Sequence, residues 1–210
     1  MAACKFFPNL ACQGRGIRHL FAMSSPTNPW KVLKAKAIYD NPWLSVTENQ
    51  VINPSGNPGI YGVIHFKNHA VAIIPVDAEQ HTWLVGQYRF PVDSYEWEIP
   101  EGGAAAGESP LACAHRELKE ETGLEAEHWQ LILEMQLSNS VTDERSSTFL
   151  ATGIRHGQAA PEETEQLHLR RVPLTEAIRM AASNEIKDAL SVASLLKLES
   201  LLARGDIKLP

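Results

Sequence analysis

Residues 102–124 constrain the fold of this 210-residue chain more than any other segment. Ser109 followed by Pro110 is typical of a helix start, with the serine as N-cap and the proline in the first turn. Gly123 can end the helix, because glycine adopts the left-handed conformation without steric cost. The segment therefore predicts one helix of defined length.

Acidic residues gather on one side of this expected helix. Glu117 and Glu121 are four positions apart and Glu120 lies between them, so their carboxylates project from adjacent rows. Leu111 and Leu118 form a separate apolar row, which we expect to pack against a core. Like charges at this spacing destabilise a bare helix. A divalent cation converts the repulsion into ligation, and carboxylate oxygens are ligands that Mg²⁺ and Mn²⁺ prefer. The alternative is a solvated acidic face.

A longer pattern favours the metal site over that alternative. Its fixed positions are Gly102, Glu108, Arg116, Glu117, Leu118, Glu120, Glu121, Gly123 and Leu124. From ordinary residue usage, chance reproduces such a register in about one chain per million or fewer. The segment resembles the Nudix box at every defining position. That family consists of metal-dependent hydrolases that cleave a nucleoside diphosphate linked to another group.

The resemblance implies an α/β fold, namely an α/β/α sandwich with a mixed β-sheet, here with an N-terminal antiparallel β extension. It implies that Glu117 and Glu121 bind Mg²⁺ or Mn²⁺, that Glu120 is a less certain ligand, and that the backbone carbonyl of Glu101 is a further one. Arg116 is expected to orient the glutamates through charge-assisted hydrogen bonds.

Three glycines stand before the expected helix. Gly102, Gly103 and Gly107 look superficially like a phosphate-binding loop, but the Lys-Ser/Thr of a nucleoside triphosphatase loop is missing. We expect them to form the turn that leads into the helix.

Other segments resemble the ADP-ribose pyrophosphatases within this family. Residues 87–89 and 96–103 are similar to the approach to the box in those enzymes, and residues 188–193 resemble their final helix. The likeness covers roughly residues 36–202. The sequence departs from those enzymes in one place, since residues 138–141 stand where a proline is often found after the box. This departure bears on the exact substrate more than on the class of enzyme.

The resemblance implies hydrolysis of ADP-ribose to AMP and ribose 5-phosphate. GDP-mannose or another nucleotide sugar is an alternative substrate, and a non-catalytic nucleotide-sensing module is an alternative of another class. Arg89 is suited to bidentate contact with the diphosphate, and Glu98 to hydrogen bonding with the substrate or a water. The alternative for both is a surface ion pair.

The general base is not fixed by the box. Glu162, Glu163 and Glu165 cluster just before an expected strand, and Glu165 best matches the position of an acidic base in similar enzymes, with Glu163 second. Glu144, in the loop after the box, is the other candidate and could instead contact the ribose or a metal-bound water. A solvated acidic loop is the alternative for the first cluster.

Composition limits the partners. A hydrophobic fraction of 44% is enough for one substantial core, and the net charge of -6 argues against a general nucleic-acid surface. No apolar run approaches the length that spans a bilayer. The three cysteines form no disulfide or zinc pattern, and Cys113 is expected to be a small buried thiol. We expect a cytoplasmic protein with no nucleic-acid or membrane partner.

The chain is expected to divide at its N-terminal end. Residues 1–29 are interpreted as a disordered extension or an organelle-targeting segment, and residues 30–210 as the hydrolase domain. Within that domain, residues 30–66 supply N-terminal strands and residues 102–124 the box. ADP-ribose pyrophosphatases of this pattern are homodimers whose N-terminal strands complete the partner's site, and a two-fold dimer is the commonest soluble assembly. The alternative is that these strands pack on their own domain.

Enrichment in β-branched and aromatic residues predicts most of the remaining elements. Strands are expected at residues 36–39, 44–52, 59–66, 70–75, 83–88, 95–99, 130–135, 147–152 and 167–172, and helices at residues 174–182 and 189–202.

Overall fold

The computed structural model describes residues 27–157 and 167–210. The candidate bases Glu163 and Glu165, with Glu162, lie outside the described residues, as does most of the expected N-terminal extension. In chain order the elements are β1 (Lys31–Asp40), β2 (Leu44–Ile52), β3 (Pro58–Phe66), β4 (His69–Val76), β5 (His81–Arg89), η1 (Phe90–Val92), β6 (Ser94–Glu98), β7 (Glu101–Ala104), α1 (Pro110–Thr122), β8 (Leu124–Gln136), β9 (Arg145–His156), β10 (His168–Pro173), α2 (Leu174–Ala182) and α3 (Ala189–Ala203).

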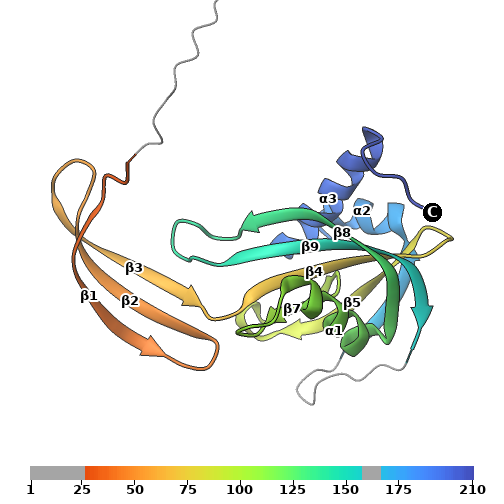
Figure 1. Cartoon of the computed structure of the whole chain (residues 1–210), viewed down its shortest axis with the longest axis horizontal. Helices are drawn as coiled ribbons and strands as arrows, with labels where there is room; N and C mark the ends of the chain where they lie inside the picture. Colours follow the sequence, from red (N-terminus) through yellow and green to blue (C-terminus); the bar gives the residue numbers. More distant parts are fainter. Residues whose placement is uncertain (1–26, 158–166) are drawn as a thin grey trace, which may run out of the picture.

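The body has three layers, with helices on both sides of the strands (Figure 1). One sheet has the order β7-β4-β9-β8 and a smaller one the order β10-β5-β6. Strand β4 pairs in parallel with β9 and antiparallel with β7, so the larger sheet is mixed. This arrangement confirms the expected α/β/α sandwich.

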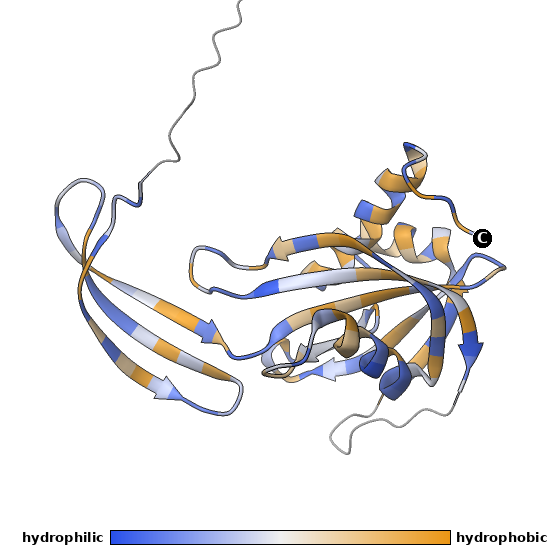
Figure 2. Cartoon of the chain, in the orientation of Figure 1, coloured by the Kyte–Doolittle hydropathy of each residue, from blue (hydrophilic) through white to orange (hydrophobic). Residues whose placement is uncertain are grey.

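Strand β4 is buried on both faces, which explains its almost continuous apolar sequence. Val71 and Ile73 belong to the core that includes α1, whereas Ala72 and Ile74 belong to the core that includes α2 and α3. Successive side chains of a strand point to opposite faces, so this one strand joins the two cores. Figure 2 shows the apolar colouring of the central strands.

The antiparallel sheet β1-β2-β3 projects from this body (Figure 1). Strand β1 is exposed throughout and β3 over much of its length in the single chain, whereas β2 is mostly half-buried. Trp43 and Ile60 are 67% and 70% exposed. The sheet therefore does not bury these apolar side chains on its own domain.

Several sequence expectations need correction. The first strand begins at Lys31 rather than at residue 36, because it pairs with β2 as far as Ile52. Strand β8 begins at Leu124 rather than at residue 130, since its pairing with β9 extends that far. Leu111 is 41% exposed and only Leu118 of the expected apolar row enters the core.

The glycines before the helix also differ from the expectation. Gly102 and Gly103 lie in strand β7, where they pair with β4. Gly107 alone of the three has a positive φ, of 87°, so the turn falls there. Of the helices in the described ranges, none is long and apolar enough to cross a membrane.

Candidate active site

The helix α1 begins and ends at its capping residues. The Ser109 hydroxyl oxygen accepts a hydrogen bond from the N–H of Ala112 at 3.2 Å. Gly123 has a φ of 69° and donates its N–H to the carbonyl of Lys119 at 2.9 Å. Leu118 is fully buried. The caps and this anchor fix the helix in its register, with its glutamates towards β7.

Two box glutamates reach the backbone of β7. Glu121 is 4% exposed, and its Oε2 accepts a hydrogen bond from the N–H of Glu101 at 3.0 Å. The carboxyl group of Glu117 lies so close to Gly102 that a Cβ added to the glycine would be 2.0 Å from the carboxyl carbon. Only glycine permits that approach. The structure thus brings together Glu117, Glu121 and the main chain at Glu101, the set that the sequence suggested.

Arg116 ties the loop, the helix and the strand together. Its Nε and Nη2 donate to the two carboxylate oxygens of Glu108, each at 3.0 Å. Its Nη1 donates to Glu117 at 2.8 Å and to Glu120 at 2.9 Å, and its Nη2 donates to the carbonyl of Gly103 at 3.2 Å. The Glu108 hydrogen bonds are the main cause of a raised pKa of Arg116. The guanidinium therefore offsets three carboxylates, as expected for a residue that orients them.

The oxygens of this region suit a hard divalent cation. Carboxylates and a backbone carbonyl are the ligands that Mg²⁺ takes in proteins. The missing side chain at Gly102 leaves the space in which the Glu117 carboxylate meets the strand. The residues present therefore fit the metal that the box implies.

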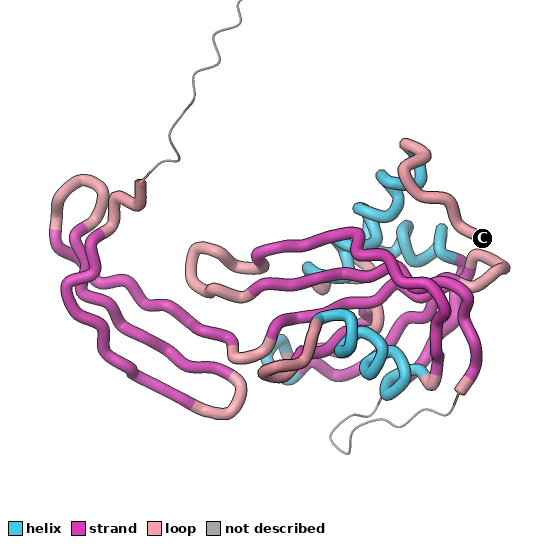
Figure 3. Tube along the Cα trace, viewed as in Figure 1, coloured by secondary structure: helices cyan, strands magenta, loops and turns pink. Residues whose placement is uncertain are grey.

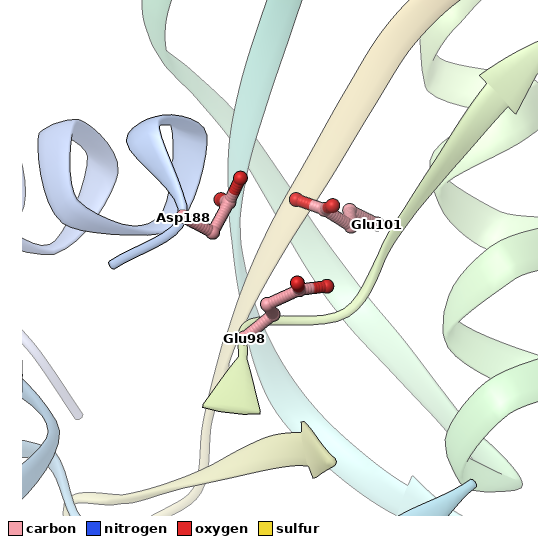
Figure 4. A group of neighbouring side chains, drawn as sticks. All are labelled: Glu98, Glu101 and Asp188. Carbon is pink, nitrogen blue, oxygen red and sulfur yellow. The ribbon is translucent and has the colours of Figure 1, made fainter. Parts of the chain in front are cut away.

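A second acidic group lies on the other side of β7. Glu98, Glu101 and Asp188 offer carboxylate oxygens that all lie within 4.8 Å of one another, and Figure 4 shows the three side chains converging. Burial is the main cause that raises the pKa of Glu101, and the charges of Asp188 and Glu98 add to it. Glu101 Oε2 is buried without a hydrogen-bond partner among the described residues. Negative charge thus dominates this group.

Arg89 is the cation that faces this group. Its Nε donates to the two oxygens of Glu98 at 2.8 and 3.0 Å, and its Nη2 donates to Glu98 and, at 2.7 Å, to Glu101. Glu98 is 3% exposed. The two residues that the sequence suggested for substrate binding are therefore hydrogen-bonded to each other, and the ion pair is buried on the carboxylate side.

A cavity of about 680 Å³ connects these elements. That volume is in the range of small-molecule sites. Its lining includes Trp43, Phe66, Arg89, Glu101, Glu144 and Asp188. Burial and the charge of Asp188 raise the pKa of Glu144. Aromatic groups of the N-terminal sheet, one guanidinium and several carboxylates therefore face one space.

Cys113 has no part in the chemistry. It is buried in α1, and burial raises the pKa of its thiol to about 12. A thiol of that pKa is not a nucleophile near neutral pH, as expected from the sequence.

The sequence did not single out three lining residues as part of the site. Asp188 could be expected to cap α3, since an acidic residue before an apolar run is a helix-start signal, but capping does not predict a place in the cavity. Trp43 and Phe66 carry no local signal for a site, because they reach it only through the fold of the N-terminal sheet.

Comparison with known families agrees with this geometry. The family model described as NUDIX domain matches residues 67–204. The one described as nucleoside diphosphate sugar hydrolase N-terminal domain matches residues 30–64. The chain belongs to the Nudix family and is a Nudix hydrolase.

The chain is also similar to individual proteins and to a solved structure. The chain is 30% identical to an ADP-ribose pyrophosphatase of Mycobacterium tuberculosis over 82% of its own length and 84% of the relative's. It is 29% identical to a methanol dehydrogenase activator of Bacillus methanolicus over 80% of this chain and 92% of that protein. A solved structure described as an ADP compounds hydrolase matches with a TM-score of 0.76 and 22% identity, and covers 88% of this chain and 100% of that one. At that identity the structural match shows the fold alone.

Proposed function

We propose that this Nudix hydrolase uses Mg²⁺, which Mn²⁺ could replace, to hydrolyse ADP-ribose to AMP and ribose 5-phosphate. The observation that carries the proposal is the convergence of Glu117 and Glu121 on the backbone of β7, at the border of the cavity. The name of one relative, the ADP-ribose pyrophosphatase of M. tuberculosis, supports ADP-ribose over GDP-mannose and other nucleotide sugars.

Glu117 and Glu121, with the carbonyl of Glu101, would hold the cation. The chemistry supplied there would be that of a Lewis acid, which would polarise the diphosphate, offset its charge and make a water molecule more acidic. Glu120 is the weaker ligand candidate, since its side chain is 28% exposed, against 13% for Glu117. Arg116 donates to Glu108 and Glu117 as well, so it would hold these carboxylates in place for the cation.

Arg89 is proposed to bind the diphosphate from the cavity wall. Among the described residues its side-chain hydrogen bonds use Nε and Nη2, so Nη1 can donate to a phosphate oxygen. Glu98 and Glu101 hold the guanidinium at a fixed orientation, which reduces the conformational entropy that binding costs.

Glu144 is the general-base candidate that the described residues place at the cavity. Burial is the main cause that raises the pKa of Glu144. A carboxylate with a raised pKa is a better proton acceptor near neutral pH than an ordinary one. Glu163 and Glu165 remain the alternatives.

A homodimer completes the proposal. The N-terminal sheet exposes Trp43, Ile60 and other apolar side chains, and a partner that covers them would remove that surface from water. The mass of the protein in solution tests this assembly independently of the substrate.

The first experiment incubates the protein with Mg²⁺ and a panel of nucleoside diphosphate sugars and measures monophosphate release. AMP from ADP-ribose at the highest kcat/KM supports the proposal, and faster release of GMP from GDP-mannose would replace the substrate. Release from no compound would favour the nucleotide-sensing module.

The variant Glu121→Gln tests the metal set in the same assay. It removes a ligand charge while the side chain keeps its size, so we expect kcat to fall roughly a thousandfold or more. Glu199→Gln, at an exposed position of α3, is the control. Full magnesium-dependent turnover in Glu121→Gln would show that the assignment is wrong.

A further inference from the structure

The loop between β8 and β9, residues 137–144, extends from the body toward the N-terminal sheet (Figure 3). The N–H of Ile64 donates to the carbonyl of Val141 at 2.9 Å, and the N–H of Asp143 donates to the carbonyl of Ile64 at 3.3 Å. The loop thereby forms a parallel bridge with the edge strand β3. The hydroxyl of Tyr61 donates to the carbonyl of Ser140 at 2.6 Å. The loop is thus attached along β3.

The carboxylate of Asp143 makes the side-chain part of this attachment. Its Oδ1 accepts from the N–H of Phe66 at 3.2 Å, and its Oδ2 lies 2.6 Å from Nδ1 of His65. The hydrogen bond from His65 is the main cause that lowers the pKa of Asp143. One carboxylate therefore holds two successive residues at the end of β3.

The next residue along the loop is Glu144, which faces the cavity. Its N–H donates to the hydroxyl of Thr142 at 3.3 Å, and its carbonyl accepts from the N–H of Leu137 at 3.4 Å. Glu144 is therefore fixed on one side by the closure of the loop and on the other by its neighbour Asp143.

We propose that Asp143, held by His65, is a positioning residue that fastens residues 137–144 to β3 and so sets the Glu144 carboxylate at the cavity. Phe66 lines the same cavity and donates its N–H to Asp143. The N-terminal sheet thus places two parts of the site of its own chain, one directly and one through the loop. The inference rests on the proposed function in so far as Glu144 acts on the substrate.

The first test does not depend on activity. Asp143→Ala should speed amide hydrogen exchange in residues 137–144, because two hydrogen bonds of the loop are lost. Asp40→Ala is the matched control, since it removes a carboxylate at the same end of the sheet that binds Lys67, the residue after Phe66. Asp143→Asn, which keeps an acceptor for the N–H of Phe66, should restore part of the protection. Unchanged exchange in Asp143→Ala overturns the attachment, whatever the enzyme hydrolyses.

The second test asks whether Asp143 acts through Glu144. Asp143→Ala should lower kcat roughly ten- to a hundredfold, since small misplacements of a reacting group carry such costs. In the background of Glu144→Gln the same substitution should have no further effect on kcat. Equal losses in both backgrounds, or a Glu144→Gln variant with full activity, overturn the positioning role. If wild-type protein hydrolyses no nucleotide sugar, the proposed function fails, and hydrogen exchange still decides the attachment.

Discussion

Gly102 illustrates how one missing side chain shapes the site. Its backbone is extended within β7, so a larger residue meets no conformational barrier there. The obstacle is the carboxyl group of Glu117, which occupies the place of the absent Cβ. The box glycine is thus explained by its contact with a glutamate and not by a turn.

Gly102→Ala should therefore impair catalysis. The methyl group displaces Glu117 or shifts β7, and overpacking of this kind costs about 1–3 kcal/mol of unfolding free energy. We expect kcat to fall at least about a hundredfold. Gly62→Ala is the control, because a Cβ there meets nothing within 4 Å. Kinetics and thermal unfolding of both variants provide the measurement, and an active Gly102→Ala would contradict the explanation.

Substitution of Asp188, followed by measurement of kcat against pH, tests the role of Glu144 as the general base. The pKa of Glu144 is raised above its ordinary value of 4.5, first by burial and then by the charge of Asp188. A base must be ionised, so kcat should rise with pH through this raised pKa. Asp188→Asn removes one negative charge, so the pKa of Glu144 falls and the acid limb of kcat moves to lower pH.

The substitution to asparagine preserves the other role of residue 188. The Asp188 carboxylate accepts from the N–H of Ser191 at 2.6 Å as the N-cap of α3, and asparagine caps equally well. Asp206→Asn, at an exposed position, is the control for a general change of charge. An unmoved acid limb would transfer the role of base to Glu163 or Glu165.

At the scale of elements, the ends of the helices could be predicted from nearby residues, whereas the ends of some strands depended on pairing with distant segments. Helix α1 occupies the expected segment and α2 has the expected bounds, because both ends of a helix are set by nearby residues. Strand β8 is longer than expected since its first residues are ordered by pairing with β9. Such pairing is not a local property, so the alternation of apolar and polar residues alone cannot set the ends of a strand.

The cap of α1 can be tested for stability alone. Ser109→Ala removes the acceptor for the N–H of Ala112, which should cost about 1 kcal/mol of unfolding free energy. Ser109→Asn keeps an acceptor and should retain most of it. Urea denaturation measures both variants, and kcat at saturating Mg²⁺ should stay close to that of wild type. A destabilisation equal in the two variants would argue that packing, and not capping, matters at this position.

At the scale of the molecule, the sequence predicted the layers through the family resemblance and missed how distant segments meet. The proximity of Glu117 and Glu121 was predictable because they share one helix. The contacts of Ile64 with residues 141–143 and of Glu98 with Asp188 join segments far apart in the chain. No periodicity encodes them, since they depend on how the sheets are placed. The cavity is for the same reason a finding of the structure.

We expect a homodimer at micromolar concentration, because the sheet β1-β2-β3 exposes apolar side chains that its own domain leaves uncovered. Ile60→Lys places a charge on this surface, at a residue that is 70% exposed in the single chain. Since burying an unpaired charge is costly, the variant should sediment as a monomer.

A control variant introduces lysine at an exposed apolar residue outside the N-terminal sheet. Leu131→Lys replaces a residue of β8 that is 46% exposed, and it should leave the mass unchanged. If the N-terminal strands complete the partner's site, Ile60→Lys should also raise KM, and the loss should diminish at high protein concentration. A wild-type protein that is monomeric and fully active would exclude the shared site, and the cavity within one chain would then be sufficient for substrate binding.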